Sequence, residues 1–191
     1  ATKYDTYVIA DEVYEHIVYA PHRHTYFATL PGMWNRTLSC SSLSKTYSIT
    51  GWRLGYIAAP ENMIEPINRL SFYMTAGATT FVQYAGVAGL LEEDGSIARM
   101  RQEFKRRRDY LVEEINKMQH FSCKKPEGAF YLFVKSPVEN EKEFCEVCKQ
   151  YNVLVVPGSS FACPGYVRIA YCVSYGQIER SLPAFRKIAE H

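Results

Sequence analysis

The stretch SSLSKTYSITGWRLGY, residues 41 to 56, places one amine, several hydroxyl groups and a guanidinium close together. An amine that is held away from water gives up its proton more readily, so Lys45 can attack a carbonyl and form a Schiff base. Arg53 can direct two parallel donors at phosphate oxygens, and the Ser42 hydroxyl can add a third. An amine beside a phosphate-binding group indicates a phosphorylated aldehyde as the ligand.

Pyridoxal 5'-phosphate is the common cofactor that is both an aldehyde and a phosphate monoester, and it makes one further demand. A carboxylate must keep its ring nitrogen protonated so that the ring can accept electrons. Asp11 is a candidate, because it ends the apolar run of YVIADEVY at a position where ligand crevices open in α/β sheets. Tyr14 follows about one helical turn later on the same side, where its phenol can donate to the ring oxygen.

Two motifs in this region resemble a known family. D-E-V-Y at 11–14, followed by S-x-S-K-x-Y-S-x-x-G-W-R-x-G-Y from Ser42 onward, is similar to the signature of class I and II aminotransferases. These are the fold-type I enzymes that depend on pyridoxal phosphate. A single S-x-x-K would be a weak signal, but five chemically distinct residues in the right order and spacing are highly specific.

The resemblance implies a role for each of these residues. Lys45 would form the internal aldimine and later carry the proton between the substrate's α-carbon and C4′ of the cofactor. Asp11 would pair with the pyridinium nitrogen and Tyr14 with the phenolic oxygen. Ser42 and Arg53 would bind the phosphate.

The second half of the chain resembles the same family. PEGAFYLF (126–133) is similar to its P-x-G-x-F-Y strand, and PGYVRIAY (164–171) is similar to the strand whose arginine binds the α-carboxylate of the amino acid. That arginine is Arg168. Its chemistry agrees, since an arginine among apolar residues needs an anionic partner and its planar fork matches a carboxylate. A salt bridge on an edge strand is the structural alternative.

The elements that must position these residues alternate between strand and helix patterns. Apolar runs predict strands at 7–10 (buried), 36–42, 55–59, 128–135, 152–156 (buried) and 166–173; helical spacing predicts helices at 61–73, 80–92, 97–118 and 176–191. The fold class is therefore α/β. The resemblance implies part of the PLP-dependent transferase (aspartate aminotransferase-like) fold: a remnant of the large domain's mainly parallel sheet (1–95), then a long connecting helix and a small C-terminal α/β domain (96–191).

Composition excludes several classes of protein. With 191 residues, 47% hydrophobic and 22% charged, the chain is globular, and a net charge of +2 gives no field that favours nucleic acid or anionic membranes. There is no apolar run of membrane-spanning length and no signal peptide, so we expect a cytoplasmic protein. The six scattered cysteines are typical of reduced thiols. The Cys145–Cys148 pair and the His22–His24 pair are weak metal motifs, and we expect no metal.

Three functions fit these observations. The first is an aminotransferase that moves an amino group between an L-amino acid, aspartate or aromatic, and a 2-oxo acid. The second is a lyase on the same fold, of the carbon–sulfur or ring-forming type, and the third is a non-catalytic scaffold. The family's enzymes are about double this length and are usually homodimeric. The resemblance places residues 72–80 in contact with the cofactor site of the partner subunit. Because the chain starts ATKYDTYVIADE without the family's upstream motifs, we expect an isolated piece of this extent to be inactive.

Overall fold

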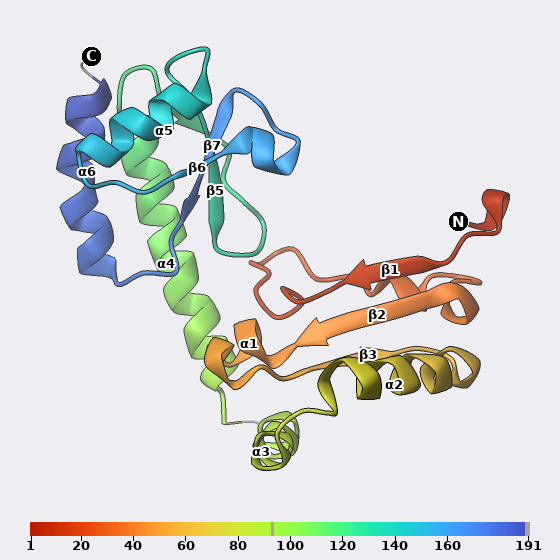
Figure 1. The fold of residues 1–191 in the computed structure, drawn as a ribbon. Helices are drawn as coiled ribbons and strands as arrows, with labels where there is room; N and C mark the ends of the chain where they lie inside the picture. The colour runs from red at the N-terminus through yellow and green to blue at the C-terminus, as the bar shows by residue number, and fades with distance from the viewer. Residues whose placement is uncertain (93, 190–191) are drawn as a thin grey trace. The chain divides into compact units, whose positions relative to one another are not determined.

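The computed structural model describes residues 1–92 and 94–189, and the chain divides into two compact units, Ala1–Arg99 and Met100–His191. Each unit combines helices with one small sheet (Figure 1). None of the helices in the described ranges has both the length and the apolar character needed to cross a membrane.

The sheet of the first unit has three strands in the order β1-β2-β3. Its strands are β1 (Val8–Asp11), β2 (Thr37–Ser42) and β3 (Gly55–Ala58). β1 runs parallel to β2 with Asp11 opposite Cys40, and β3 runs antiparallel to β2 with Gly55 opposite Ser42. A side chain at Gly55 would place its Cβ 2.7 Å from the Ser41 carbonyl oxygen, so only glycine lets β3 approach β2 this closely.

Three α-helices and four short 3-10 turns complete the first unit. The α-helices are α1 (Leu43–Thr46), α2 (Glu61–Thr75) and α3 (Thr80–Leu91), and the turns are η1 (Thr2–Tyr4), η2 (Phe27–Thr29), η3 (Trp34–Arg36) and η4 (Thr50–Trp52). α3 packs on α1 through Gly86, where an added Cβ would lie 3.1 Å from the Leu43 side chain of α1 and 2.5 Å from that of Leu54. The Tyr47 hydroxyl, just after α1, donates to the Gly89 carbonyl of α3. These contacts hold α1 in place.

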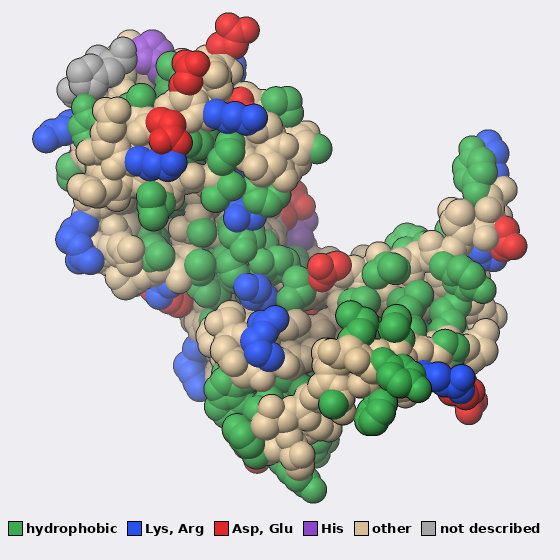
Figure 2. All heavy atoms as spheres, in the orientation of Figure 1, with side chains coloured by type: hydrophobic (Ala, Val, Ile, Leu, Met, Phe, Trp, Pro, Cys, Tyr) green, Lys and Arg blue, Asp and Glu red, His purple; other side chains and the backbone are tan. Residues whose placement is uncertain are grey.

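The burial predicted for the first strand is wrong. In β1 the residues alternate between partly buried and exposed, and Ile9 is 76% exposed. β1 has a strand partner on one side only, and α2 contributes no buried residue among those described. Apolar side chains therefore gather at the surface over α2 and α3, as Figure 2 shows.

The second unit is built on an antiparallel sheet in the order β4-β5-β7-β6. Its elements are α4 (Ser96–Asn116, which begins in the first unit), β4 (Ser122–Cys123), β5 (Tyr131–Lys135), α5 (Glu141–Gln150), β6 (Val156–Pro157), η5 (Gly158–Phe161), β7 (Tyr166–Ala170) and α6 (Tyr175–Ala189). α4 supplies Leu111 and Ile115 to the core, β5 supplies Leu132, and α6 supplies Phe185. Leu111 and Ile115 belong to the apolar face that the helical spacing predicts for this helix, and that face is the one that is buried.

Strand 152–156 was predicted as buried, but of its residues only Val153 is buried. Only Val156–Pro157 pairs with the sheet, and Leu154 is 82% exposed. The residues before Val156 instead begin with the turn that follows α5, in which Asn152 adopts a left-handed φ of 58° and the Val153 N–H bonds to the Cys148 carbonyl. After this turn the chain makes no strand pairing until β6, which pairs with β7 from Val156.

Candidate active site

Five of the six predicted site residues lie in the first unit, around one edge of its sheet. The carboxyl ends of the parallel strands β1 and β2 carry Asp11 and Ser42, and α1, which carries Lys45, begins directly after Ser42. Since β3 is antiparallel, its amino end lies at the same edge, and Arg53 comes two residues before it. Carboxyl ends of strands are where ligands bind in open α/β sheets.

The Asp11 carboxylate is presented at the surface. The residue is exposed, and its Oδ1 atom accepts a hydrogen bond of 3.3 Å from the Val13 N–H. The Glu12 N–H bonds to the Cys40 carbonyl at 2.9 Å and so extends the β1–β2 ladder beyond Asp11. Tyr14 stands in the turn that follows, closed by a 2.9 Å bond from the Ile17 N–H to the Tyr14 carbonyl.

Ser42 starts the short helix that carries Lys45. Its hydroxyl accepts from the Ser44 N–H at 3.2 Å and donates to the Leu54 carbonyl at 3.3 Å. The neighbours of Lys45 within α1, Ser44 and Thr46, are buried, whereas Lys45 itself is half-buried. α1 is thus anchored on both sides of the amine.

Arg53 follows η4 in a left-handed conformation with a φ of 56°. Its Nη1 donates to the Thr50 carbonyl at 2.9 Å, and no carboxylate in the described parts of the chain pairs with it. Arg53 also lines a hollow of about 530 Å³ together with Gly77 and Thr79 from the segment between α2 and α3. Its remaining N–H groups can therefore meet an anionic ligand.

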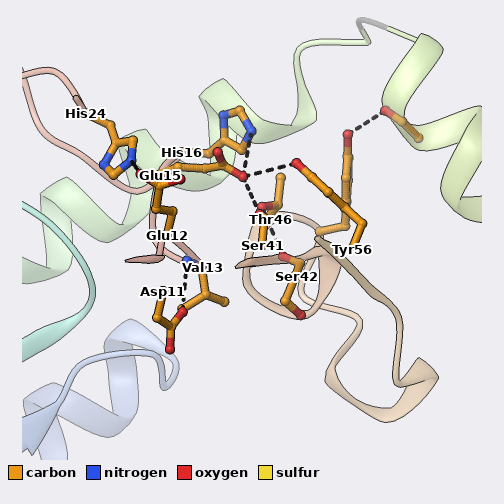
Figure 3. A network of polar contacts seen from close by, with 12 residues as sticks. Asp11, Glu12, Val13, Glu15, His16, His24, Ser41, Ser42, Thr46 and Tyr56 are labelled. Atoms are coloured by element: carbon orange, nitrogen blue, oxygen red, sulfur yellow. Dashed lines mark hydrogen bonds and ion pairs between the residues drawn. The ribbon is translucent and has the colours of Figure 1, made fainter. Parts of the chain in front are cut away.

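A buried polar network beside these residues was not anticipated from the sequence (Figure 3). The Glu15 side chain is only 4% exposed, and its Oε1 accepts hydrogen bonds from the Ser41 hydroxyl and, at 3.4 Å, from the Tyr56 hydroxyl. Partial burial and a hydrogen bond to Glu15 raise the pKa of Tyr26 to about 12. The one available signal was an acidic residue, Glu15, shortly before the apolar run at 17–19.

Glu12 forms a second buried contact in the same loop. Its side chain is 7% exposed, and its Oε1 accepts from the Phe27 N–H at 2.9 Å. His24 Nε2 lies 3.4 Å from the same oxygen without hydrogen-bond geometry. His24 thus faces a carboxylate, and no group of three or more metal-binding side chains occurs among the residues that the structure describes.

The Cys145–Cys148 pair lies on α5 with both side chains buried. Burial raises the pKa of the Cys148 thiol to about 12. A thiol that stays protonated is a poor nucleophile and a poor metal ligand, so this pair behaves as part of the core.

Arg168 belongs to the second unit, and the structure does not bring it into the same unit as the other five residues. It lies on β7, where its guanidinium carbon is 4.3 Å from the centre of the Tyr131 ring and 4.0 Å from that of Phe161. No acidic partner for Arg168 occurs in the described residues, so it forms no edge-strand salt bridge there. The guanidinium packs against these two aromatic rings, and its N–H groups remain available to a planar anion such as a carboxylate.

The chain is similar to several known aminotransferases. The chain is 40% identical to an aspartate aminotransferase of Pyrococcus abyssi and 39% identical to aromatic-amino-acid aminotransferase 2 of Thermococcus litoralis, in each case over 98% of this chain and 50% of the relative. The crystal structure of an aromatic aminotransferase from Pyrococcus horikoshii matches with a TM-score of 0.94 and 38% identity, over 99% of this chain and 52% of that one.

The chain therefore spans about half the length of the curated relatives it matches. The α/β fold class is confirmed as part of the aminotransferase fold. The described part of the first sheet is mixed, with one parallel and one antiparallel pair of strands. The family model for class I and II aminotransferases matches residues 1–185. The chain belongs to the class I and II aminotransferase family.

Proposed function

We propose that the whole protein to which this chain belongs is a pyridoxal phosphate-dependent aminotransferase that moves an amino group between an L-amino acid and a 2-oxo acid. One observation carries the proposal: an amine, a carboxylate and a guanidinium without an acidic partner gather at one edge of the first unit's sheet. This donor set fits an aldehyde, a pyridinium nitrogen and a phosphate respectively.

Each residue has a defined part in this proposal. Lys45 holds the cofactor aldehyde covalently and afterwards moves the proton to and from the substrate's α-carbon. Asp11, with its second carboxylate oxygen open, pairs with the ring nitrogen, and Tyr14 donates to the ring oxygen. Ser42 and Arg53 bind the phosphate. Pyridoxal phosphate, when bound, supplies a conjugated ring that accepts the electron pair released at the α-carbon.

In the second unit, Arg168 is proposed to bind the substrate's α-carboxylate. A guanidinium that packs against two rings is already oriented, so little side-chain entropy is lost when a carboxylate arrives. The curated relatives are named for aspartate and for aromatic amino acids, and we propose a donor from these two classes.

We also propose an oligomeric state and a cellular location. Phe72, Tyr73 and Met74 are 66–80% exposed at the end of α2 and continue into the segment that lines the hollow at Arg53. Such a patch beside the site fits a homodimer of the whole protein. All six cysteines are free, which fits a reducing, cytoplasmic environment.

The experiment is an assay of the full-length parent protein with L-aspartate or L-phenylalanine as the donor and 2-oxoglutarate as the acceptor. We expect glutamate to form, and Lys45→Ala to abolish the reaction while Lys124→Ala, at an exposed lysine, leaves it unchanged. Pyruvate and ammonia released from cystathionine without glutamate formation would identify a lyase instead. Absence of both reactions in the wild-type protein would point to a non-catalytic scaffold.

A further inference from the structure

We propose that Glu15 is a positioning residue that holds Tyr14 in register with the phosphate-binding end of the site. This inference rests on the proposed function, because it concerns how residues of the cofactor site are kept in place. It assigns a role to a buried carboxylate that takes no part in the chemistry outlined above.

The burial of Glu15 requires an explanation. Its side chain is 4% exposed, and a carboxylate out of water is costly unless hydrogen bonds replace the lost water. Here the donors are hydroxyl groups of Ser41, Tyr56 and Tyr26, with His16 Nε2 at 3.9 Å. The carboxylate is therefore held by side chains rather than by solvent.

These donors come from three separate segments of the first unit. Ser41 lies on β2, Tyr56 lies on β3, and Tyr26 immediately precedes η2. Figure 3 shows the Glu15 carboxylate facing Ser41 and Tyr56 from the loop that follows β1. The Glu15 side chain thus connects the loop after β1 to both β2 and β3.

Each anchored position is adjacent to a residue of the proposed site. Glu15 follows Tyr14, and Ser41 precedes Ser42. Tyr56 follows Gly55, which is paired with Ser42. The turn around Tyr14 is short, with the Glu15 N–H bonded to the Glu12 carbonyl at 2.9 Å, so a shift of Glu15 moves Tyr14 as well. The carboxylate therefore couples the position of the phenol to the position of the phosphate-binding strand.

Glu12 provides a matched control in the same loop. It is buried to a similar degree, at 7% exposed, but its contacts go to the Phe27 N–H and to His24, which are within that loop. Removing the Glu12 carboxylate leaves the links to β2 and β3 intact.

The test is a double-mutant cycle in the full-length parent protein, read by the dissociation constant of added pyridoxal phosphate from an absorbance titration. Tyr14→Phe removes only the phenol hydroxyl, and we expect it to weaken binding about 10-fold. Glu15→Ala should weaken binding by a similar factor. The double variant should bind about as well as either single one, since Glu15 acts through Tyr14.

Multiplying effects, about 100-fold weaker binding in the double variant, would overturn the proposal, as would a Glu15→Ala variant with unchanged affinity. In the control cycle, Glu12→Ala should combine multiplicatively with Tyr14→Phe. If Glu15→Ala unfolds before its affinity can be measured, Ser41→Ala combined with Tyr56→Phe takes its place, because these changes remove the two hydroxyl donors that tie the Glu15 carboxylate to β2 and β3.

The melting temperature of the cofactor-free protein, measured for every variant, separates loss of folding from loss of positioning. Failure of this inference is distinguishable from failure of the proposed function. If borohydride fixes pyridoxal phosphate on Lys45 but the effects of Glu15→Ala and Tyr14→Phe on the dissociation constant multiply, only the role proposed for Glu15 is lost. If Lys45 takes no label, the proposed function itself fails.

Discussion

The two compact units contain similar apolar side chains but bury them to different extents. Among the described residues of the first unit, four hydrophobic side chains are buried: Ile17, Tyr19, Leu43 and Val82. Among the residues of the second unit that the structure describes, nineteen are buried, from Phe104 to Ile188, and they come from α4, α5, α6, the sheet and the loops between them. The second unit therefore has a hydrophobic core of its own, whereas the first unit buries only a few of its apolar side chains.

The buried part of the first unit lies around the candidate site. Leu43, Ser44 and Thr46 surround Lys45 on α1, and Ile17 follows the turn that carries Tyr14. Leu70 and Phe72 of α2, in contrast, are 60% and 66% exposed. The comparison shows that tight packing in this unit is concentrated where the chemistry is proposed.

The largest expected effect comes from separating the two units. A fragment of residues 96–191 should unfold in one cooperative thermal transition, because its core is complete. A fragment of residues 1–95 should bind the dye ANS strongly and show no cooperative transition, because it buries too little apolar surface. Circular dichroism and dye fluorescence check both outcomes, and two equally cooperative fragments would remove the contrast between the units.

A smaller effect is expected when equal changes are made in the two units. Leu132→Ala, at a side chain with no exposure, should lower the free energy of unfolding by about 2–5 kcal/mol, since it leaves a cavity. Leu70→Ala, at 60% exposure, should change it by no more than about 0.5 kcal/mol. Leu154→Ala is the control for an exposed leucine within the second unit. Urea unfolding of the whole chain measures all three, and similar losses at Leu132 and Leu70 would contradict the account.

The smallest effect concerns the ion pairs on α4. Arg106 and Arg107, both bonded to Glu103, lower the pKa of that carboxyl to about 2. Because the folded pKa is depressed, the stabilisation is present above the ordinary glutamate value of about 4.5 and is lost as pH falls toward 2. The Glu103 side chain is 35% exposed, so solvent screening keeps the gain below about 1 kcal/mol.

Glu103→Gln should therefore be slightly less stable than the wild type at pH 7 and equally stable near pH 2. Urea unfolding of the 96–191 fragment at both pH values measures this difference. A difference that stayed constant across this range would mean that the pairs contribute nothing through charge.

Sequence patterns predicted most helices and strands, but they did not predict which of their side chains are buried. Hydrophobic spacing located β2, β3 and the four long helices to within a few residues, because this spacing is a property of each segment alone. The burial of Ile9 and of Leu154 was predicted wrongly, since an apolar run does not say which neighbour will cover it. Burial is decided by elements far away in the chain.

The same limit applies to the site. Asp11 and Lys45 could be singled out because the chemistry of each residue is visible within a short motif. The partners of Glu15, in contrast, are 26 residues away at Ser41 and 41 residues away at Tyr56. No local spacing links these residues, and only the pairing of β1, β2 and β3 brings them together.

The central claim is that the amine of Lys45 holds the cofactor. The most direct measurement adds pyridoxal phosphate to the full-length parent protein, reduces the product with borohydride and maps the labelled peptide by mass spectrometry. The account predicts one label, on Lys45 within SLSKTYS. A label on another lysine, or no label on a protein that transfers amino groups normally, would contradict it.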